Sequence, residues 1–307
     1  MYGRGVPLRL VSFGDGGSRA GIVCRDGTIS DVTDLIPSDL ATGKGALRRI
    51  IQGYDGLRDQ LSRRERSGGG VTLDSLVLSA PVSDPTKIVA APVNYIDHME
   101  EMQQLSHIDS LGVFLKAPSS LIGEGGTVRL PYSNRRFDQE GELCFVIGKQ
   151  ARNVKVEEAD EYIFGYSVLL DITMRGGEDR STRKSFDTFT PMGPWVITSD
   201  EVGSLDDLEL RCWVNGSLRQ DARVSDLIWG VPELVAYVSS VMTLFPGDVI
   251  STGTPKGVGQ LADGDKIVVE ISRVGRLSVS VSDLGATFSV TRGGSSVPNQ
   301  LSSQQSG

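Results

Sequence analysis

Short apolar runs separated by glycine and charged residues dominate the N-terminal part of the chain. Residues 8–13, 20–24 and 28–32 have the length of strands and are bounded by turn residues. Between residues 46 and 66 the apolar positions recur at helical spacing. The expected inner face of this helix carries Leu47, Ile50, Ile51, Leu57 and Leu61. We therefore expect a small α+β domain over residues 1–80.

From residue 81 onward the apolar runs are mostly strand-like and few are helical. Asn215-Gly216, between two such runs, is a dipeptide typical of a tight β-hairpin. Strands are also expected at 266–271, 276–281 and 287–291, and helices at 157–162 and 231–242. The pattern predicts a mainly β domain with some helix over residues 81–292. The Ser-, Gln- and Gly-rich tail at 293–307 is expected to be disordered.

Charge and length exclude two classes of partner. The 307 residues carry a formal net charge of -8, which argues against non-specific nucleic-acid binding. No apolar run is long enough to span a membrane. Residues 1–10 lack the apolar core of a secretory signal, so we expect a cytoplasmic protein.

Cysteine and histidine are too few and too scattered to suggest a zinc site. Cys24, Cys144 and Cys212 are far apart and lie in apolar or strand-like contexts, where we expect buried free thiols. His98 and His107 are the two histidines of the chain. A bound metal would therefore have mostly oxygen ligands, which Mg²⁺, Mn²⁺ and Ca²⁺ prefer.

Two glutamates, Glu140 and Glu142, stand at the start of an apolar run that is expected to be a buried strand. Because side chains alternate along a strand, both point to the same face. Two neighbouring carboxylates repel each other and lose solvation on burial. A bound divalent cation would offset both costs.

A third acidic residue, Asp171, ends another apolar run at residues 165–173. An isolated buried carboxylate is costly unless it is paired or coordinated. Asp171 would complete an oxygen cage with the two glutamates. Alternatively, it satisfies backbone groups at the end of its strand, and the pattern leaves both interpretations open.

His98 and Glu101 are three residues apart in a short segment that we expect to be helical, so they share one face. A carboxylate beside an imidazole orients the ring and favours a general base. The alternative is a solvated surface histidine with an incidental ion pair, which spacing alone favours. His107 has no such partner and is expected at the surface.

Lysine and glycine residues indicate further ligand contacts. Lys116 and Lys184 stand among apolar residues, where a buried ammonium would need an anion such as a carboxylate substrate. Alternatively, each lysine buries only its aliphatic part and extends its ammonium into solvent. The glycine-rich segment 246–259 lacks a Walker A pattern. We expect it to expose backbone N–H groups and the Thr254 hydroxyl to a ligand.

Six blocks occur in order over residues 87–291 and together form a specific pattern. The blocks are Asn94-Tyr95-x-x-His98-x-x-Glu101, Phe114-Leu115-Lys116, Glu140-Gly141-Glu142-Leu143, Gly165-Tyr166 with Asp171-Ile172-Thr173, Lys184-Ser185-Phe186-Asp187, and Pro246-Gly247-Asp248 with Gly253-Thr254-Pro255. In these blocks the chain resembles the fumarylacetoacetate hydrolase superfamily, and in particular its acylpyruvate hydrolase-like branch.

The resemblance implies a mixed β-roll around the active site, a preceding small domain and a homodimer. It implies a divalent cation, Mg²⁺, Mn²⁺ or Ca²⁺, and a water-activating dyad on a lid helix. The site residues expected on this basis are His98, Glu101 and Lys184 for catalysis, Glu140, Glu142 and Asp171 for the metal, and Lys116, Arg175, Glu178 and Thr254 for substrate.

The activity implied by the resemblance is hydrolysis of a C–C bond in an acylpyruvate-type 2,4-diketo acid, which gives pyruvate and a carboxylic acid. Oxaloacetate decarboxylation, and isomerisation or hydration of a 2-oxo-enoic acid, use similar enolate chemistry and stay open. A non-catalytic ligand-binding protein on the same scaffold is an alternative from another class. The intact carboxylate trio and dyad count against it.

The chain departs from the superfamily pattern after the metal-binding aspartate. Many members have Arg-Asp-x-Gln there, and this chain has Arg175-Gly176-Gly177-Glu178. An acid thus replaces a substrate-facing amide. We expect this change to favour a polar or hydroxylated acyl group over a second carboxylate.

Overall fold

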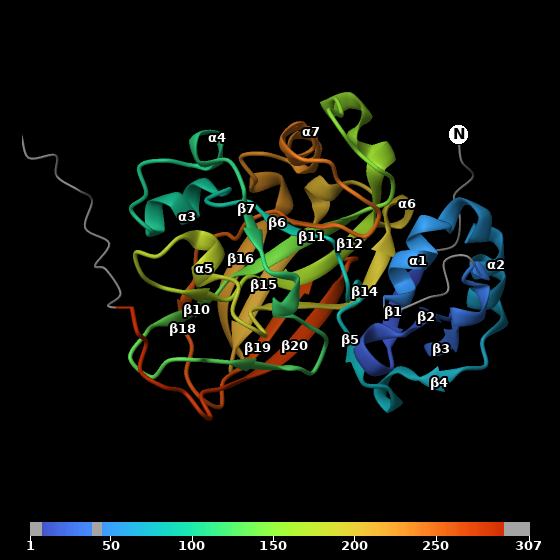
Figure 1. Cartoon of the computed structure of the whole chain (residues 1–307), viewed down its shortest axis with the longest axis horizontal. Helices are drawn as coiled ribbons and strands as arrows, with labels where there is room; N and C mark the ends of the chain where they lie inside the picture. Colours follow the sequence, from blue (N-terminus) through green and yellow to red (C-terminus); the bar gives the residue numbers. More distant parts are fainter. Residues whose placement is uncertain (1–7, 39–44, 292–307) are drawn as a thin grey trace, which may run out of the picture.

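A twelve-stranded sheet is the largest element of the fold (Figure 1). The computed structural model describes residues 8–38 and 45–291. In spatial order the sheet joins β4 (Val71–Thr72), β3 (Thr28–Asp31), β2 (Arg19–Val23), β1 (Arg9–Phe13), β14 (Thr190–Thr198), β12 (Ile163–Leu170), β11 (Gly141–Ile147), β17 (Val249–Ser251), β6 (Ile88–Ala90) and β7 (Phe114–Lys116). Two short strands lie off this path, β5 (Leu78–Ser79) on β1 and β8 (Leu121–Ile122) on β14.

Two smaller sheets complete the β structure. One joins β13 (Thr173–Met174), β10 (Phe137–Gln139) and β18 (Gly259–Gln260), and the other joins β16 (Ser217–Arg223), β15 (Glu209–Val214), β19 (Lys266–Ile271), β20 (Gly275–Ser282) and β9 (Thr127–Arg129). β15 alternates buried and partly exposed residues, since one face packs on the core. β11 and β12 are buried at every position, because both of their faces are covered.

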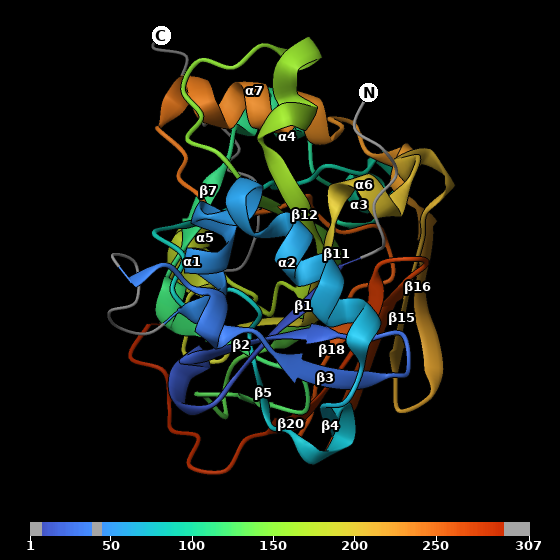
Figure 2. The ribbon, with the colours of Figure 1, turned by 90° about the vertical axis from the view of Figure 1, so that its right-hand side faces the viewer.

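The helices are short and lie around the sheets. They are α1 (Ala46–Gln52), α2 (Tyr54–Ser67), α3 (Ile96–Glu101), α4 (Ile108–Leu111), α5 (Arg180–Arg183), α6 (Ser199–Val202) and α7 (Val231–Val241). α1 and α2 pack beside β1 and β2 at one end of the molecule (Figure 2). α3 and α5 lie toward the opposite end (Figure 1).

The N-terminal region shares both its sheet and its core with the rest of the described chain. β1 pairs with β14 through Arg9 opposite Ile197. One apolar cluster contains Leu10 and Ile22 from the N-terminal strands together with Phe164 from β12. The division into domains near residue 80 therefore stays a prediction. The tail predicted to be disordered, residues 293–307, lies outside the described residues.

Most of the predicted elements are present, and the mainly β fold with helices is confirmed. The helix predicted over residues 46–66 is interrupted at Gly53, where φ -98° and ψ 6° depart from helical values. Asn215 and Gly216 have φ 52° and 78°, as a type I′ hairpin turn requires. The 231–242 helix is α7, and the 157–162 helix is a 3-10 helix, Val156–Tyr162.

The strand predicted at residues 287–291 is wrong. Thr287 forms an isolated bridge with Tyr132, and the following residues form no strand. The polar side chains compete with strand pairing here, because Thr291 bonds to Arg135 and Glu178. Among the residues described, no helix combines the length and apolar character needed to cross a membrane.

Candidate metal centre and active site

Strand pairing brings the three predicted metal ligands together. Glu140 and Glu142 flank Gly141 at the start of β11, and Asp171 directly follows β12. These strands are antiparallel with Gly141 opposite Leu170, so Asp171 lies beside the glutamates, and its N–H donates to the Glu140 carbonyl at 2.8 Å. All three carboxylates are buried, and one oxygen of each lies within 4.8 Å of the others.

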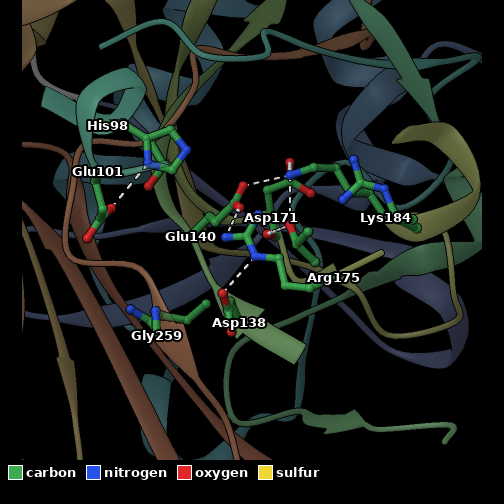
Figure 3. A network of polar contacts seen from close by, with 12 residues as sticks. His98, Glu101, Asp138, Glu140, Asp171, Arg175, Lys184 and Gly259 are labelled. Atoms are coloured by element: carbon green, nitrogen blue, oxygen red, sulfur yellow. Dashed lines mark hydrogen bonds and ion pairs between the residues drawn. The ribbon is translucent and has the colours of Figure 1, made fainter. Parts of the chain in front are cut away.

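Buried cations neutralise two of these carboxylates (Figure 3). Lys184 Nζ donates to Glu140 Oε2 at 2.6 Å and to Asp171 Oδ2 at 2.5 Å. Arg175 Nη2 lies 2.9 Å from Glu140 Oε1, and Lys116 Nζ donates to Asp171 Oδ1. Burial opposes ionisation of Glu140, but Lys184 and Arg175 together hold its pKa well below the usual range.

Glu142 has hydrogen-bond donors but no cation in an ion pair among the described residues. Its Oε2 accepts from Ser251 Oγ and, at 2.8 Å, from the Gly253 N–H. Burial, followed by repulsion from Asp171, raises the pKa of Glu142 to about 8. An all-oxygen donor set with one uncompensated carboxylate fits a hard divalent cation. Glu140, Glu142 and Asp171 would hold this ion.

Metal binding is expected to release close to one proton per site at pH 7. The reason is that Glu142 must ionise to act as a ligand, and its pKa in the metal-free protein is about 8. Titration calorimetry with Mn²⁺ in two buffers of different ionisation enthalpy measures this release. The release should vanish well above pH 8, and a pH-independent binding heat would contradict the prediction.

His98 and Glu101 form the predicted pair on α3. His98 is buried, so the surface interpretation is wrong, and its Nδ1 lies 3.4 Å from Glu101 Oε2. Burial lowers the pKa of His98, although Glu140 and Glu101 act in the opposite direction. The ring is therefore neutral at pH 7 and able to accept a proton. Glu101 Oε1 also accepts the Gly257 N–H at 2.9 Å, which fixes the carboxylate.

A cavity of about 560 Å³ joins the carboxylates to the dyad helix. Its polar and charged lining residues include His98, Gln103, Gln104, Ser106, Glu140, Glu142, Arg175, Arg180, Arg183, Lys184 and Thr254. The volume suits a small organic acid. A proton acceptor, cations and candidate metal ligands thus line one cavity.

Two of the four predicted substrate-binding residues line this cavity, Arg175 and Thr254. Lys116 is not among the lining residues, because it lies fully buried behind Asp171 and also donates to the Phe189 carbonyl at 3.1 Å. Glu178 does not line it either. Its two oxygens accept from Arg135 at 2.7 and 2.8 Å.

Sequence reasoning missed Gln220, a buried residue of β16. Its Oε1 accepts the Gly141 N–H at 2.9 Å, and its Nε2 donates to Thr254 Oγ1 at 2.8 Å. The amide thereby ties the Glu140–Glu142 segment to the glycine-rich loop. Nothing in the hairpin sequence indicates this contact. Arg180 and Arg183 were also missed, although the density of arginine in this loop was a signal.

Comparison with known proteins assigns the family. The model described as "Fumarylacetoacetate (FAA) hydrolase C-terminal" matches residues 87–282. The chain belongs to the fumarylacetoacetate hydrolase family. The match includes Glu140, Glu142 and Asp171 and begins before α3.

Members of this family with curated names are similar over most of the chain. A maleylpyruvate hydrolase of Aquipseudomonas alcaligenes is 44% identical over 243 residues, 76% of this chain and 85% of that protein. A mitochondrial oxaloacetate tautomerase of Xenopus laevis is 34% identical over 88% of this chain and 89% of its own length. A crystal structure of maleylpyruvate hydrolase from Sphingobium sp. SYK-6, in complex with manganese (II) ion and pyruvate, has a TM-score of 0.80 at 39% identity, covering 90% of this chain and 99% of that one.

Proposed function

We propose that this protein hydrolyses a C–C bond in an acylpyruvate-type 2,4-diketo acid and forms pyruvate and a carboxylic acid. The observation that carries the proposal is that Glu140, Glu142 and the buried, neutral His98 line one cavity, with Asp171 beside the two glutamates and Glu101 beside His98. The similarity to maleylpyruvate hydrolases, one of them crystallised with manganese and pyruvate, supports it.

The chain's own residues can perform the proton transfers of this reaction. His98 Nε2 takes a proton from water as its oxygen adds to the C4 carbonyl, while Glu101 steadies the imidazolium through Nδ1. The C3–C4 bond then breaks, and C3 receives the proton held by His98. C4, which now carries two oxygens, becomes the carboxyl carbon of the acid product.

The remaining groups stabilise charge and orient the substrate. Lys184, fixed by Glu140, Asp171 and Thr173, offsets negative charge that develops on the pyruvate half. A bound Mg²⁺ or Mn²⁺ would supply Lewis-acid stabilisation of that charge. Arg175 and Thr254 are proposed to contact the substrate, whereas Lys116 positions Asp171 from behind.

The test of this function is a panel of 2,4-diketo acids with different acyl groups, incubated with the Mn²⁺-loaded protein. Pyruvate and the matching acid should appear in equal amounts, because hydrolysis splits each substrate once. Coupled reduction of pyruvate measures the rate. A protein that releases pyruvate from none of the panel is not an acylpyruvate hydrolase.

Oxaloacetate chemistry is the second candidate, and the Xenopus tautomerase favours it. Bifunctional isomerase/decarboxylases of 4-hydroxyphenylacetate degradation are also similar, for example the one of Escherichia coli at 43% identity over 62% of this chain. Tautomerisation, decarboxylation and 2-oxo-enoate isomerisation each need a stabilised enolate but no attacking water. Turnover of oxaloacetate without release of pyruvate from diketo acids would favour this candidate.

We also propose that the protein is cytoplasmic and forms a homodimer, and that its ligand is a small 2-oxo acid. Three buried free cysteines agree with a reducing compartment. The dimer rests on the family resemblance.

A further inference from the structure

Three arginines of one loop line the cavity, but carboxylates of the protein pair with only one of them. Arg175 donates from Nε to Asp138 Oδ2 at 2.7 Å and lies beside Glu140. Arg180 and Arg183, at the two ends of α5, face the same cavity. Within residues 8–38 and 45–291, no acidic side chain forms an ion pair with either of these two.

Within the described residues, no ion pair therefore compensates the charge of Arg180 or of Arg183. The Arg180 side chain is half-buried and makes no hydrogen bond to the rest of the described chain. Arg183 donates only to carbonyls, from Nε to Glu178 at 2.8 Å and from Nη1 to Met174 at 3.4 Å. Burial, and then the positive charges of Arg175 and Arg180, lower the pKa of Arg183, although Glu140 and Glu178 act in the opposite direction. Two like charges on a cavity wall attract an anion from solution.

The acidic residues of the same loop do not neutralise this wall. Both oxygens of Glu178 are held by Arg135, and Oε1 also accepts from Thr291 Oγ1 at 2.6 Å. Asp179 is exposed, and its Oδ1 accepts the Ser181 N–H at 2.8 Å. The expected preference for an uncharged acyl group assumed that Glu178 faces substrate, so that expectation loses its basis.

We propose that Arg180 and Arg183 bind a second carboxylate at the far end of the substrate, which makes the preferred substrate a dicarboxylic 2,4-diketo acid. The inference rests on the proposed function for the reaction, but its own evidence is the arginine pair. The 2-oxo acid end of such a molecule would lie at Glu140, Glu142 and Lys184. A guanidinium binds a carboxylate through two parallel hydrogen bonds, which selects for this group.

The experiment compares two ligands of equal length, 2-oxoheptanedioate and 2-oxoheptanoate, which differ only in the distal carboxylate. Calorimetry with the Mn²⁺-loaded protein gives both dissociation constants without need of turnover. The diacid should bind about 10- to 100-fold more tightly to the wild type. Arg180→Gln should reduce that ratio to near one, and Arg180→Lys should retain part of it.

The matched control is Arg66→Gln, which removes one exposed arginine from α2. It should leave the ratio unchanged. A ratio near one in the wild type overturns the inference. Equal weakening of both ligands by Arg180→Gln also overturns it, since Arg180 would then bind the carboxylate common to both. A clear diacid preference in a protein that cleaves no diketo acid would instead contradict the proposed function and uphold the binding of a distal carboxylate by Arg180 and Arg183.

Discussion

Replacing His98 with alanine is expected to lower pyruvate release from a 2,4-diketo acid by about 100- to 10,000-fold. His98 is the buried, neutral group that can take a proton from water in the cavity, and the replacement leaves no other imidazole among the residues that line it. The carboxylates and their lysine partners are untouched, so metal binding should persist. Steady-state rates and Mn²⁺ affinity, measured on the same preparation, separate the two effects.

Two comparisons make this result specific. His107 follows on the same segment, pairs with Asp109 at 3.0 Å and does not line the cavity, so His107→Ala should keep wild-type activity. Oxaloacetate decarboxylation needs no attacking water and should survive in His98→Ala if it uses the same metal site. Full diketo acid cleavage by His98→Ala would show that the dyad assignment is wrong.

Replacing Glu142 with glutamine should abolish metal binding and yet stabilise the metal-free protein at pH 8. Glutamine keeps an oxygen for Ser251 and the Gly253 N–H but cannot ionise. The pKa of Glu142 rises from 4.5 in the unfolded chain to about 8 in the folded one. The wild type therefore loses stability as the pH rises through this interval, and the variant does not. Denaturant unfolding with a chelator, at several pH values, measures the difference.

Asp171→Asn is the matched comparison for Glu142→Gln. It also removes one candidate metal ligand, but it leaves the buried ammonium of Lys116 without its carboxylate and weakens the pairing of Lys184. Breaking a buried ion pair in this way costs about 3–5 kcal/mol of unfolding free energy. Equal stability losses in the two variants would mean that Glu142 is as well compensated as Asp171.

The sequence identifies those parts of the site that depend on local periodicity. Strand periodicity predicts that Glu140 and Glu142 share a face, which needs no knowledge of the fold, and the structure places their carboxylates together although β11 begins only at Gly141. The sequence around Asp171 did not distinguish a metal ligand from a residue that satisfies backbone groups at the end of its strand. Its contribution depends on the antiparallel pairing of Gly141 with Leu170, a contact between residues far apart in the chain.

Sequence reasoning did not anticipate side-chain partners that are distant in sequence. Glu178 was expected at the substrate, but Arg135, 43 positions earlier, binds both of its oxygens. Lys116 was expected to contact a ligand, but its ammonium donates to Asp171 and to a backbone carbonyl. Residue type and spacing indicated the need of each group for a counter-charge. They did not indicate which counter-charge the fold provides.

The ion-pair network also links the binding of cation and substrate to each other. When Glu142 is ionised, the four carboxylates Asp138, Glu140, Glu142 and Asp171 face four cationic groups, Lys116, Arg136, Arg175 and Lys184. A divalent ion alone would add two positive charges to this balanced network, in a cavity whose wall also carries Arg180 and Arg183. A dianionic ligand would offset those two charges, so the ion and the ligand should each raise the affinity of the site for the other by the same factor. The protein would then retain its metal most firmly while substrate is bound.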